Sequence, residues 1–186
     1  MPERLTGKFL ISAKHLNDPS FFRSVILIVQ HDENGAMGLI INKPQEGTLQ
    51  TLISGIPSTD PINMALFCGG PVDHEVVCVL HQMDEDSEEG LQILPNLRLG
   101  ASEALLEQLM SPDSKTQSQF RIFCGYSGWS AGQLEAEIKR GDWYTTAADA
   151  ETVFHEQPLE LWEQLVASYE QEHRFLPIDP NVAQWN

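Results

Sequence analysis

The residues in this sequence that most suggest chemistry are two cysteines, each at the end of an apolar run and each followed by glycine. If the runs ending at Cys68 and Cys124 are strands that point the same way, both glycine turns lie at one edge of a sheet, where open α/β sheets bind ligands. Glycine lets a ligand approach backbone N–H groups, and a helix starting nearby adds its positive end, which favours an anion or carboxylate. We therefore expect a ligand-binding crevice formed by Gly69, Gly70, Pro71, Gly125, Ser127, Gly128, Trp129 and Ser130. In the alternative interpretation, both cysteines are small core residues and the glycines serve tight packing.

A nucleophile or a base is the second kind of chemistry that these residues suggest. Ser127 lies in a strand–turn–helix pattern similar to the hydrolase motif G-x-S-x-G, but Trp129 stands where the motif has its second glycine. His31 and Asp32 could form a base with its orienting acid, although adjacent strand residues point to opposite faces. A hydrolase or transferase using Cys124, Ser127 or His31 is thus the alternative to a binding protein, and we assign no catalytic residue.

Metal ligands are present without the spacing that marks a metal site. None of the histidines has the short helical or Cys-x-x-Cys spacing of a zinc site; the candidates are His15, His31, His74 and His81. The acidic run at 84–90 lacks the alternating ligands of a calcium loop. We expect no metal and no other cofactor.

The secondary-structure elements that position these residues are mostly strands in the first part of the chain. In the second part, strands alternate with helices. Apolar runs predict strands at 8–13, 24–31, 37–42, 65–68, 76–81, 91–94, 119–124 and 143–145. Capping residues and apolar periodicity predict helices at 48–54, 102–110, 130–140, 149–154 and 158–171. We expect a hairpin at Asn34-Gly35, where both residues tolerate positive φ, and a strand pair formed by 65–68 and 76–81. The predicted fold is α/β, a mixed β-sheet sandwich with helices packed on the sheet, in one domain spanning 1–186.

The charge and composition exclude several classes of partner. With 11 basic against 27 acidic residues, the net charge is −16, and the basic residues are scattered, so we expect no direct binding to nucleic acid or to an anionic membrane. No apolar run approaches the length of a membrane span, and the first residues do not form a secretory signal. Three cysteines make no disulfide framework, which indicates a cytoplasmic protein.

Three stretches of the sequence carry motifs that occur in a fixed order. They are GKFLISAKHLNDPSFFRSVILIVQHDENGAMGLIINKP, CGGPVDHEVVCVLH and GYSGWSAGQLEAEIKRGDW. Together they closely resemble the bacterial AlgH/YqgE family, from about Gly7 to beyond Trp162. Besides the glycine turns, the positions that match its signature are His31, Gly35, Gly38, Asn42, Pro44, Gln133 and Glu137.

The resemblance implies an α/β fold and a cytosolic bacterial protein with a genetic link to the control of alginate production. It implies no reaction, ligand or catalytic set. We therefore predict a non-enzymatic regulatory or adaptor protein, a candidate transcriptional regulator that does not itself touch DNA. It would bind a small anionic ligand or a protein partner in the glycine-lined crevice.

Overall fold

The computed structural model describes residues 4–48, 65–82, 90–102, 104–105 and 119–173. The strands are β1 (Lys8–Ser12), β2 (Val25–Asp32), β3 (Gly35–Ile40), β4 (Pro44–Thr48), β5 (Ala65–Cys68), β6 (Val72–Gln82), β7 (Leu91–Leu94), β8 (Leu97–Gly100), β9 (Phe120–Ser130) and β10 (Trp143–Ala147). The helices are α3 (Gln133–Arg140), α4 (Ala150–Val153), the 3-10 turn η1 (Pro158–Glu160) and α5 (Leu161–His173).

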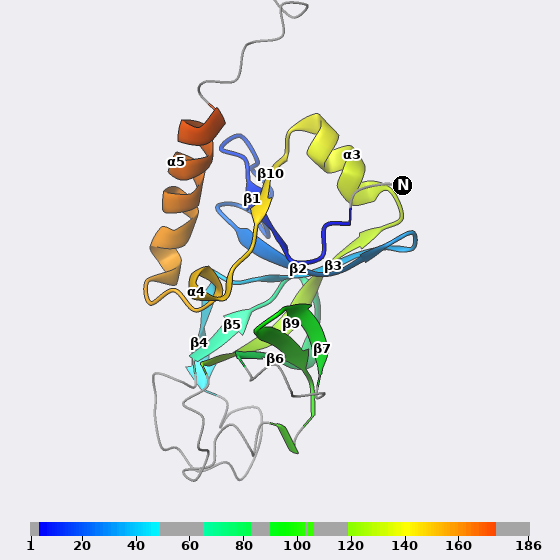
Figure 1. Cartoon of the computed structure of the whole chain (residues 1–186), viewed down its shortest axis with the longest axis vertical. Helices are drawn as coiled ribbons and strands as arrows, with labels where there is room; N and C mark the ends of the chain where they lie inside the picture. Colours follow the sequence, from blue (N-terminus) through cyan, green and yellow to red (C-terminus); the bar gives the residue numbers. More distant parts are fainter. Residues whose placement is uncertain (1–3, 49–64, 83–89, 103, 106–118, 174–186) are drawn as a thin grey trace, which may run out of the picture.

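The strands form one curled sheet that is mostly antiparallel. Its order is β10-β1-β2-β3-β9-β6-β8-β7, with β5 paired to β9 and β4 paired to β5. The pairing of β5 with β9 is parallel, so the sheet is mixed as predicted, and the α/β class is confirmed. A sandwich is not confirmed, because the strands curl into a half-barrel and few helices cover them (Figure 1).

The upper part of the sheet separates two hydrophobic cores, which explains why β2 is apolar at every early position. Val25, Leu27 and Val29 face one side, where α5 packs. Ile26 and Ile28 face the other side, where α3 packs. Because successive strand residues alternate between faces, a strand covered on both sides needs a continuous apolar run. Figure 1 shows α3 and α5 on opposite sides of β1 and β10.

The β2–β3 hairpin lies where the sequence predicts it, with a different turn. Asp32 pairs with Gly35, so Glu33 and Asn34 form the turn. Gly35 has φ 138° and Asn34 does not have positive φ, so only one residue of the predicted pair uses the conformation that we invoked.

Two predictions about the central strands are wrong. The strand that we expected to end at Cys124 continues as β9 to Ser130, because residues from Ser127 onward pair with β3. The segment 125–129 is therefore a bent strand, with Gly125 at φ 70°, and not a turn. The expected pair of 65–68 with 76–81 does not form, because β9 lies between β5 and β6 and bonds to both.

The end of α3 at Gly141 lies where the sequence predicts it, whereas α3 begins at Gln133 and α5 begins at Leu161, each three residues later than predicted. Gly141 ends α3 in the left-handed conformation, and the Asp149 side chain accepts a hydrogen bond from the Thr152 N–H at the start of α4. The capping box at the start of α3 is only half present: Ser130 N–H donates to the Gln133 side chain, and Gly132 is the N-cap. No helix in the described part of the chain has both the length and the apolar character needed to span a bilayer.

Several predicted elements fall outside the described residues. These are most of the helix expected at 48–54, the acidic turn at 84–90, most of the helix at 102–110 and the tail after 175. At the start of the 102–110 segment, the Leu105 N–H donates to the Ser102 hydroxyl at 3.1 Å, which is the bond that an N-cap serine makes.

Substituting Gly69 tests how tightly the middle of the sheet is packed. A Cβ at Gly69 would stand 2.2 Å from the Gly125 carbonyl oxygen, whereas a Cβ at Gly128 would meet nothing closer than 3.5 Å. We expect Gly69→Ala to lower the free energy of unfolding by at least ~2 kcal/mol. Gly128→Ala is the matched control and should change it by less than ~0.5 kcal/mol. Urea denaturation measures both, and equal effects would contradict this packing.

Candidate functional site

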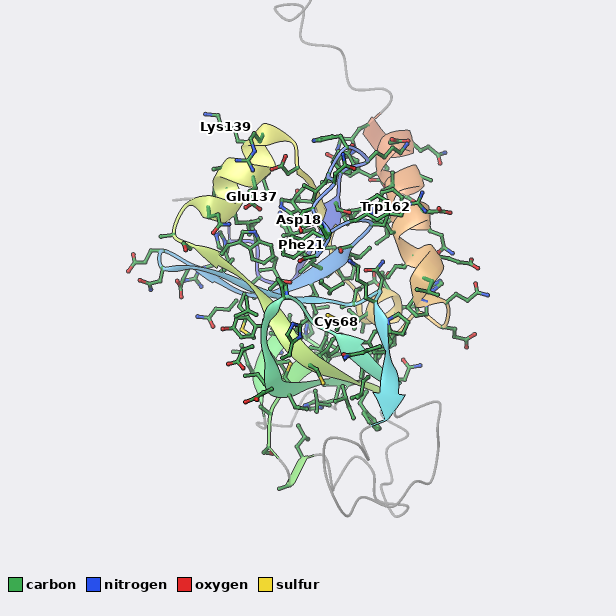
Figure 2. The ribbon with its side chains drawn as sticks, turned by 180° about the vertical axis from the view of Figure 1, so that it is seen from behind. Asp18, Phe21, Cys68, Glu137, Lys139 and Trp162 are labelled. Carbon is green, nitrogen blue, oxygen red and sulfur yellow. The ribbon has the colours of Figure 1, made fainter. Side chains whose placement is uncertain are left out.

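The two cysteine–glycine segments lie side by side, as the sequence predicts. Cys68 and Cys124 are register partners in the parallel β5–β9 pair, so the expectation that these strands point the same way is confirmed. Figure 2 shows Cys68 at the centre of the molecule, where the upper and lower strands meet. The following residues remain in contact: a Cβ at Gly70 would stand 2.3 Å from the backbone carbonyl of Tyr126.

Hydrogen bonds within the sheet already use the backbone polar groups of Gly69 and the hydroxyl of Ser127. The Gly69 N–H donates to the Cys124 carbonyl at 2.9 Å, and its own carbonyl accepts from the Ile40 N–H at 2.9 Å. That carbonyl also accepts a bond from the Ser127 hydroxyl at 3.2 Å. Backbone atoms thus occupy the space between the two segments, which favours the tight-packing interpretation of the glycines. Anion binding there stays a prediction that this geometry does not support.

The remaining residues of the predicted crevice differ in burial. Pro71, Gly128 and Ser130 are exposed, and the Trp129 ring is buried in the core that α3 covers. Among the eight residues, Pro71, Gly128 and Ser130 are thus exposed, and the other five are buried.

The candidate nucleophiles and the candidate base are buried. Ser127 is 0% exposed and Cys124 only 4% exposed. Burial raises the pKa of the Cys124 thiol, and the neighbouring Cys68 raises it further, so the thiolate is disfavoured. A substrate carbonyl would have to enter the sheet to reach either group.

His31 is held by hydrogen bonds on both ring nitrogens. Its Nδ1 accepts from the Leu5 N–H at 3.1 Å, and its Nε2 lies 3.0 Å from the Glu135 carboxylate. With Nδ1 as an acceptor, Nε2 carries the proton and donates to Glu135. This bond ties the β2–β3 end of the sheet to α3, and His31 itself is 6% exposed.

Glu137 joins two tryptophans that are distant in the sequence. Its Oε2 accepts hydrogen bonds from the indole N–H groups of Trp129 and Trp143, both at 2.8 Å. Its Oε1 accepts from the Gln133 amide at 3.0 Å. Phe21 stacks on Trp129 with ring centroids 6.1 Å apart, which closes this aromatic cluster. Two signature positions, Gln133 and Glu137, thus hold α3 on the sheet.

The other signature positions shape the strands. Asn42 accepts from the Val25 N–H at 2.8 Å and donates to the Arg23 carbonyl at 2.9 Å, fixing the entry into β2. In β3, a Cβ at Gly38 would stand 2.6 Å from the Ile26 side chain. Pro44 begins β4. Each has a structural explanation in the described part of the chain.

Arg121 is a half-buried cation that the sequence analysis did not single out. Its guanidinium donates to the carbonyls of Ile41, at 3.1 Å, and His155, and lies 4.5 Å from the centre of the Phe67 ring. Burial lowers its pKa to about 10. These bonds connect β9 to the segment after α4.

A pocket of about 460 Å³ lies beside α5 and was also missed from the sequence. We call it the α5 pocket; it is lined by Lys14, Phe22, Arg23, Trp162, Glu163, Val166, Ala167 and Glu170. Trp162 and Val166 are buried, whereas Phe22 is 48% exposed. The sequence signal for this pocket was the run Phe21-Phe22-Arg23 after the Asp18-Pro19 turn. Two aromatic side chains in an irregular segment must be buried against another element or form part of a binding surface.

The charged residues of the α5 pocket are paired with one another. Lys14 lies 2.5 Å from Glu170, and Arg23 lies 3.0 Å from Glu163. The Arg23 guanidinium also lies over the Trp162 ring, 5.0 Å from its centre. Among the described residues, no three histidine, cysteine or carboxylate groups converge as metal ligands would.

Removing the Glu137 carboxylate tests the aromatic cluster. Glu137→Ala leaves two indole N–H groups without their acceptor, and we expect a loss of ~2–4 kcal/mol in the free energy of unfolding. The exposed Glu172 provides the control, since Glu172→Ala should cost less than ~0.5 kcal/mol. Tryptophan fluorescence during urea denaturation reports both; a near-neutral Glu137→Ala would contradict the assigned role.

A pH titration tests the His31–Glu135 contact. A backbone hydrogen bond, and then His31, hold the pKa of Glu135 below its ordinary value of 4.5. Because this pKa is depressed by folding, the stabilisation is complete above the unfolded-state value and is lost as the pH falls through the folded-state value. Wild type should therefore exceed Glu135→Gln in stability at pH 7, and the difference should shrink below about pH 4.5. A difference that does not change with pH would contradict the contact.

Comparison with known proteins shows what this architecture is similar to. A family model described as AlgH-like matches residues 9–174. A UPF0301 protein from Chlorobaculum tepidum is 37% identical over 97% of this chain and 95% of its own length. A UPF0301 protein from Photobacterium profundum is 34% identical over 88% of this chain and 90% of its own length.

Two solved structures share the fold. The solution structure of the AlgH protein from Pseudomonas aeruginosa superposes with a TM-score of 0.73 at 31% identity, covering 100% of this chain and 97% of that one. The crystal structure of a protein from Corynebacterium diphtheriae has a TM-score of 0.75 at 22% identity, covering 98% and 93%, and is similar in fold alone. The matched family model spans nearly all of the described residues, and this chain belongs to the AlgH-like family.

Proposed function

We propose that this protein is a non-enzymatic regulatory or adaptor protein of the cytoplasm that binds a basic protein partner at the α5 pocket. The observation that carries the proposal is Phe22, a large apolar side chain 48% exposed beside the buried apolar residues of that pocket. An exposed aromatic residue next to a concave, partly apolar surface is typical of an interaction site.

The burial of the reactive groups argues against the enzymatic alternative. Ser127, Cys124 and His31 are all at most 6% exposed, and the hydroxyl of Ser127 and both ring nitrogens of His31 are engaged in hydrogen bonds. A hydrolase or transferase needs its nucleophile and base to meet the substrate within hydrogen-bond reach.

The charges favour a protein over a small anion as the occupant. Both pocket cations already contact carboxylates, so a small anion would have to displace Glu170 from Lys14 or Glu163 from Arg23. A protein surface can instead cover Phe22 and keep these pairs at the rim of the interface. The net charge of −16 attracts a basic partner and repels nucleic acid.

The cytoplasmic location is supported by the cysteines. All three are free thiols in the structure, and two of them are buried among strands. Free thiols are typical of a reducing compartment, in which any disulfide between them is transient.

A photo-crosslinking experiment tests the proposal. A photoreactive phenylalanine analogue is placed at position 22, and in a matched control at position 91, where exposed Leu91 lies in β7. We expect a basic protein to be crosslinked from position 22 and not from position 91. The purified partner should bind wild type in a salt-sensitive manner and bind Phe22→Ala at least ~10-fold more weakly.

Three results would contradict the proposal. They are equal crosslinking from both positions, equal weakening by Phe22→Ala and Leu91→Ala, and a partner that binds equally well at high salt.

As a separate probe, inorganic phosphate is titrated while the NMR signals of Lys14 and Arg23 are followed. Saturable shifts there, without a protein crosslink from position 22, would support the small-anion alternative instead.

A further inference from the structure

Two of the three cysteines lie side by side on neighbouring strands. Cys68 and Cys124 occupy the same register position in the parallel β5–β9 pair, and both are free thiols. Side chains at one register position point to the same face of a sheet. The third cysteine, Cys78, packs with Phe67 and Phe123 in the core cluster that α5 covers. Because strand residues alternate, Cys68 and Cys124 lie on the opposite face from that cluster.

The spacing of the strands suits a covalent link between the two sulfur atoms. Neighbouring strands lie about 4.8 Å apart, and disulfides join residues whose Cα atoms are about 4.4–6.8 Å apart. The two thiols also interact electrostatically, because Cys68 contributes to the raised pKa of Cys124. The strand register selects this pair, because Cys124 also raises the pKa of Cys78, which pairs in register with Phe123 and not with Cys124.

We infer that Cys68 and Cys124 form a redox modification site, closing to an intramolecular disulfide by exchange with a low-molecular-weight disulfide. First, the Cys68 thiolate attacks one sulfur of that disulfide; a new S–S bond forms, the old one breaks, and one small thiolate leaves with the electron pair. Next, the Cys124 thiolate attacks the Cys68 sulfur and releases the second small thiolate. Two protein thiols are oxidised, one disulfide is reduced to two thiols, and the two cysteine protons pass through solvent to the leaving thiolates.

The surroundings assign the first step to Cys68. Its side chain is half-buried, whereas Cys124 is 4% exposed, so an external disulfide reaches Cys68 first. Lys43 lies beside it: the Cys68 N–H donates to the Lys43 carbonyl at 3.0 Å. Burial lowers the pKa of the Lys43 ammonium, and Cys68 and Asp18 act against that shift. The Lys43 ammonium itself donates to the Ser20 carbonyl at 2.8 Å, so the exposure of Cys68, and not a neighbouring cation, assigns the first step to it.

Peptide mapping after oxidation tests the assignment. Folded wild-type protein is equilibrated with glutathione disulfide and glutathione at several ratios, remaining thiols are alkylated, and the digest is analysed by mass spectrometry. We expect a Cys68–Cys124 peptide link that grows with the share of glutathione disulfide, disappears with excess glutathione, and leaves Cys78 as a free thiol.

Single substitutions separate the two steps. Cys78→Ala is the matched control and should close the same link. Cys124→Ala should stop at a glutathione adduct on Cys68, whereas Cys68→Ala should slow modification of Cys124 at least tenfold. A link that involves Cys78, a link between two chains, or no protein disulfide at any ratio would overturn the inference. The wild-type peptide map tests the inference without any substitution. Its result therefore stands even if one of the variants fails to fold.

Discussion

The sheet depends on a close backbone contact at its centre. β9 pairs with β5 as far as Cys124 and with β3 from Ser127 onward, so one strand serves two different neighbours on the same edge. Gly69 bridges the point where the partner of β9 changes from β5 to β3. Its N–H donates to β9, and its carbonyl accepts a hydrogen bond from the end of β3. A side chain at position 69 would collide with the Gly125 carbonyl, so the two halves of the sheet share β9 only because the backbones can touch.

Most signature residues of the family serve this architecture in the described part of the chain. Glu137 and His31 use their polar atoms to fasten α3 and the amino-terminal segment to the sheet. Asn42 fixes the start of β2, and the glycines permit close strand contacts. A buried polar group must be hydrogen-bonded, and these residues satisfy one another without an external ligand. For this reason we look for the binding function at the α5 pocket, where an aromatic side chain is exposed.

The sequence predicted the local features and missed those that depend on distant neighbours. The unbroken apolar run of β2, the end of α3 at Gly141 and the short helix α4 each follow from short-range patterns. The segment 125–129 was predicted as a turn because glycines are typical of turns, yet here they let a strand bend and change partners. The α5 pocket was missed because Phe22 and Trp162 are 140 residues apart and only the fold brings them together.

Native-state hydrogen exchange tests the central contact most directly. If the junction is a packed joint, the amide protons of Gly69 and Ile40 should exchange only through global unfolding, with the same denaturant dependence as the core of β2. If these segments instead open to present their amides to a ligand, both protons should exchange through local fluctuations, much faster than the core and independently of denaturant. The second result would contradict our account of the sheet and restore the glycine crevice as a binding site.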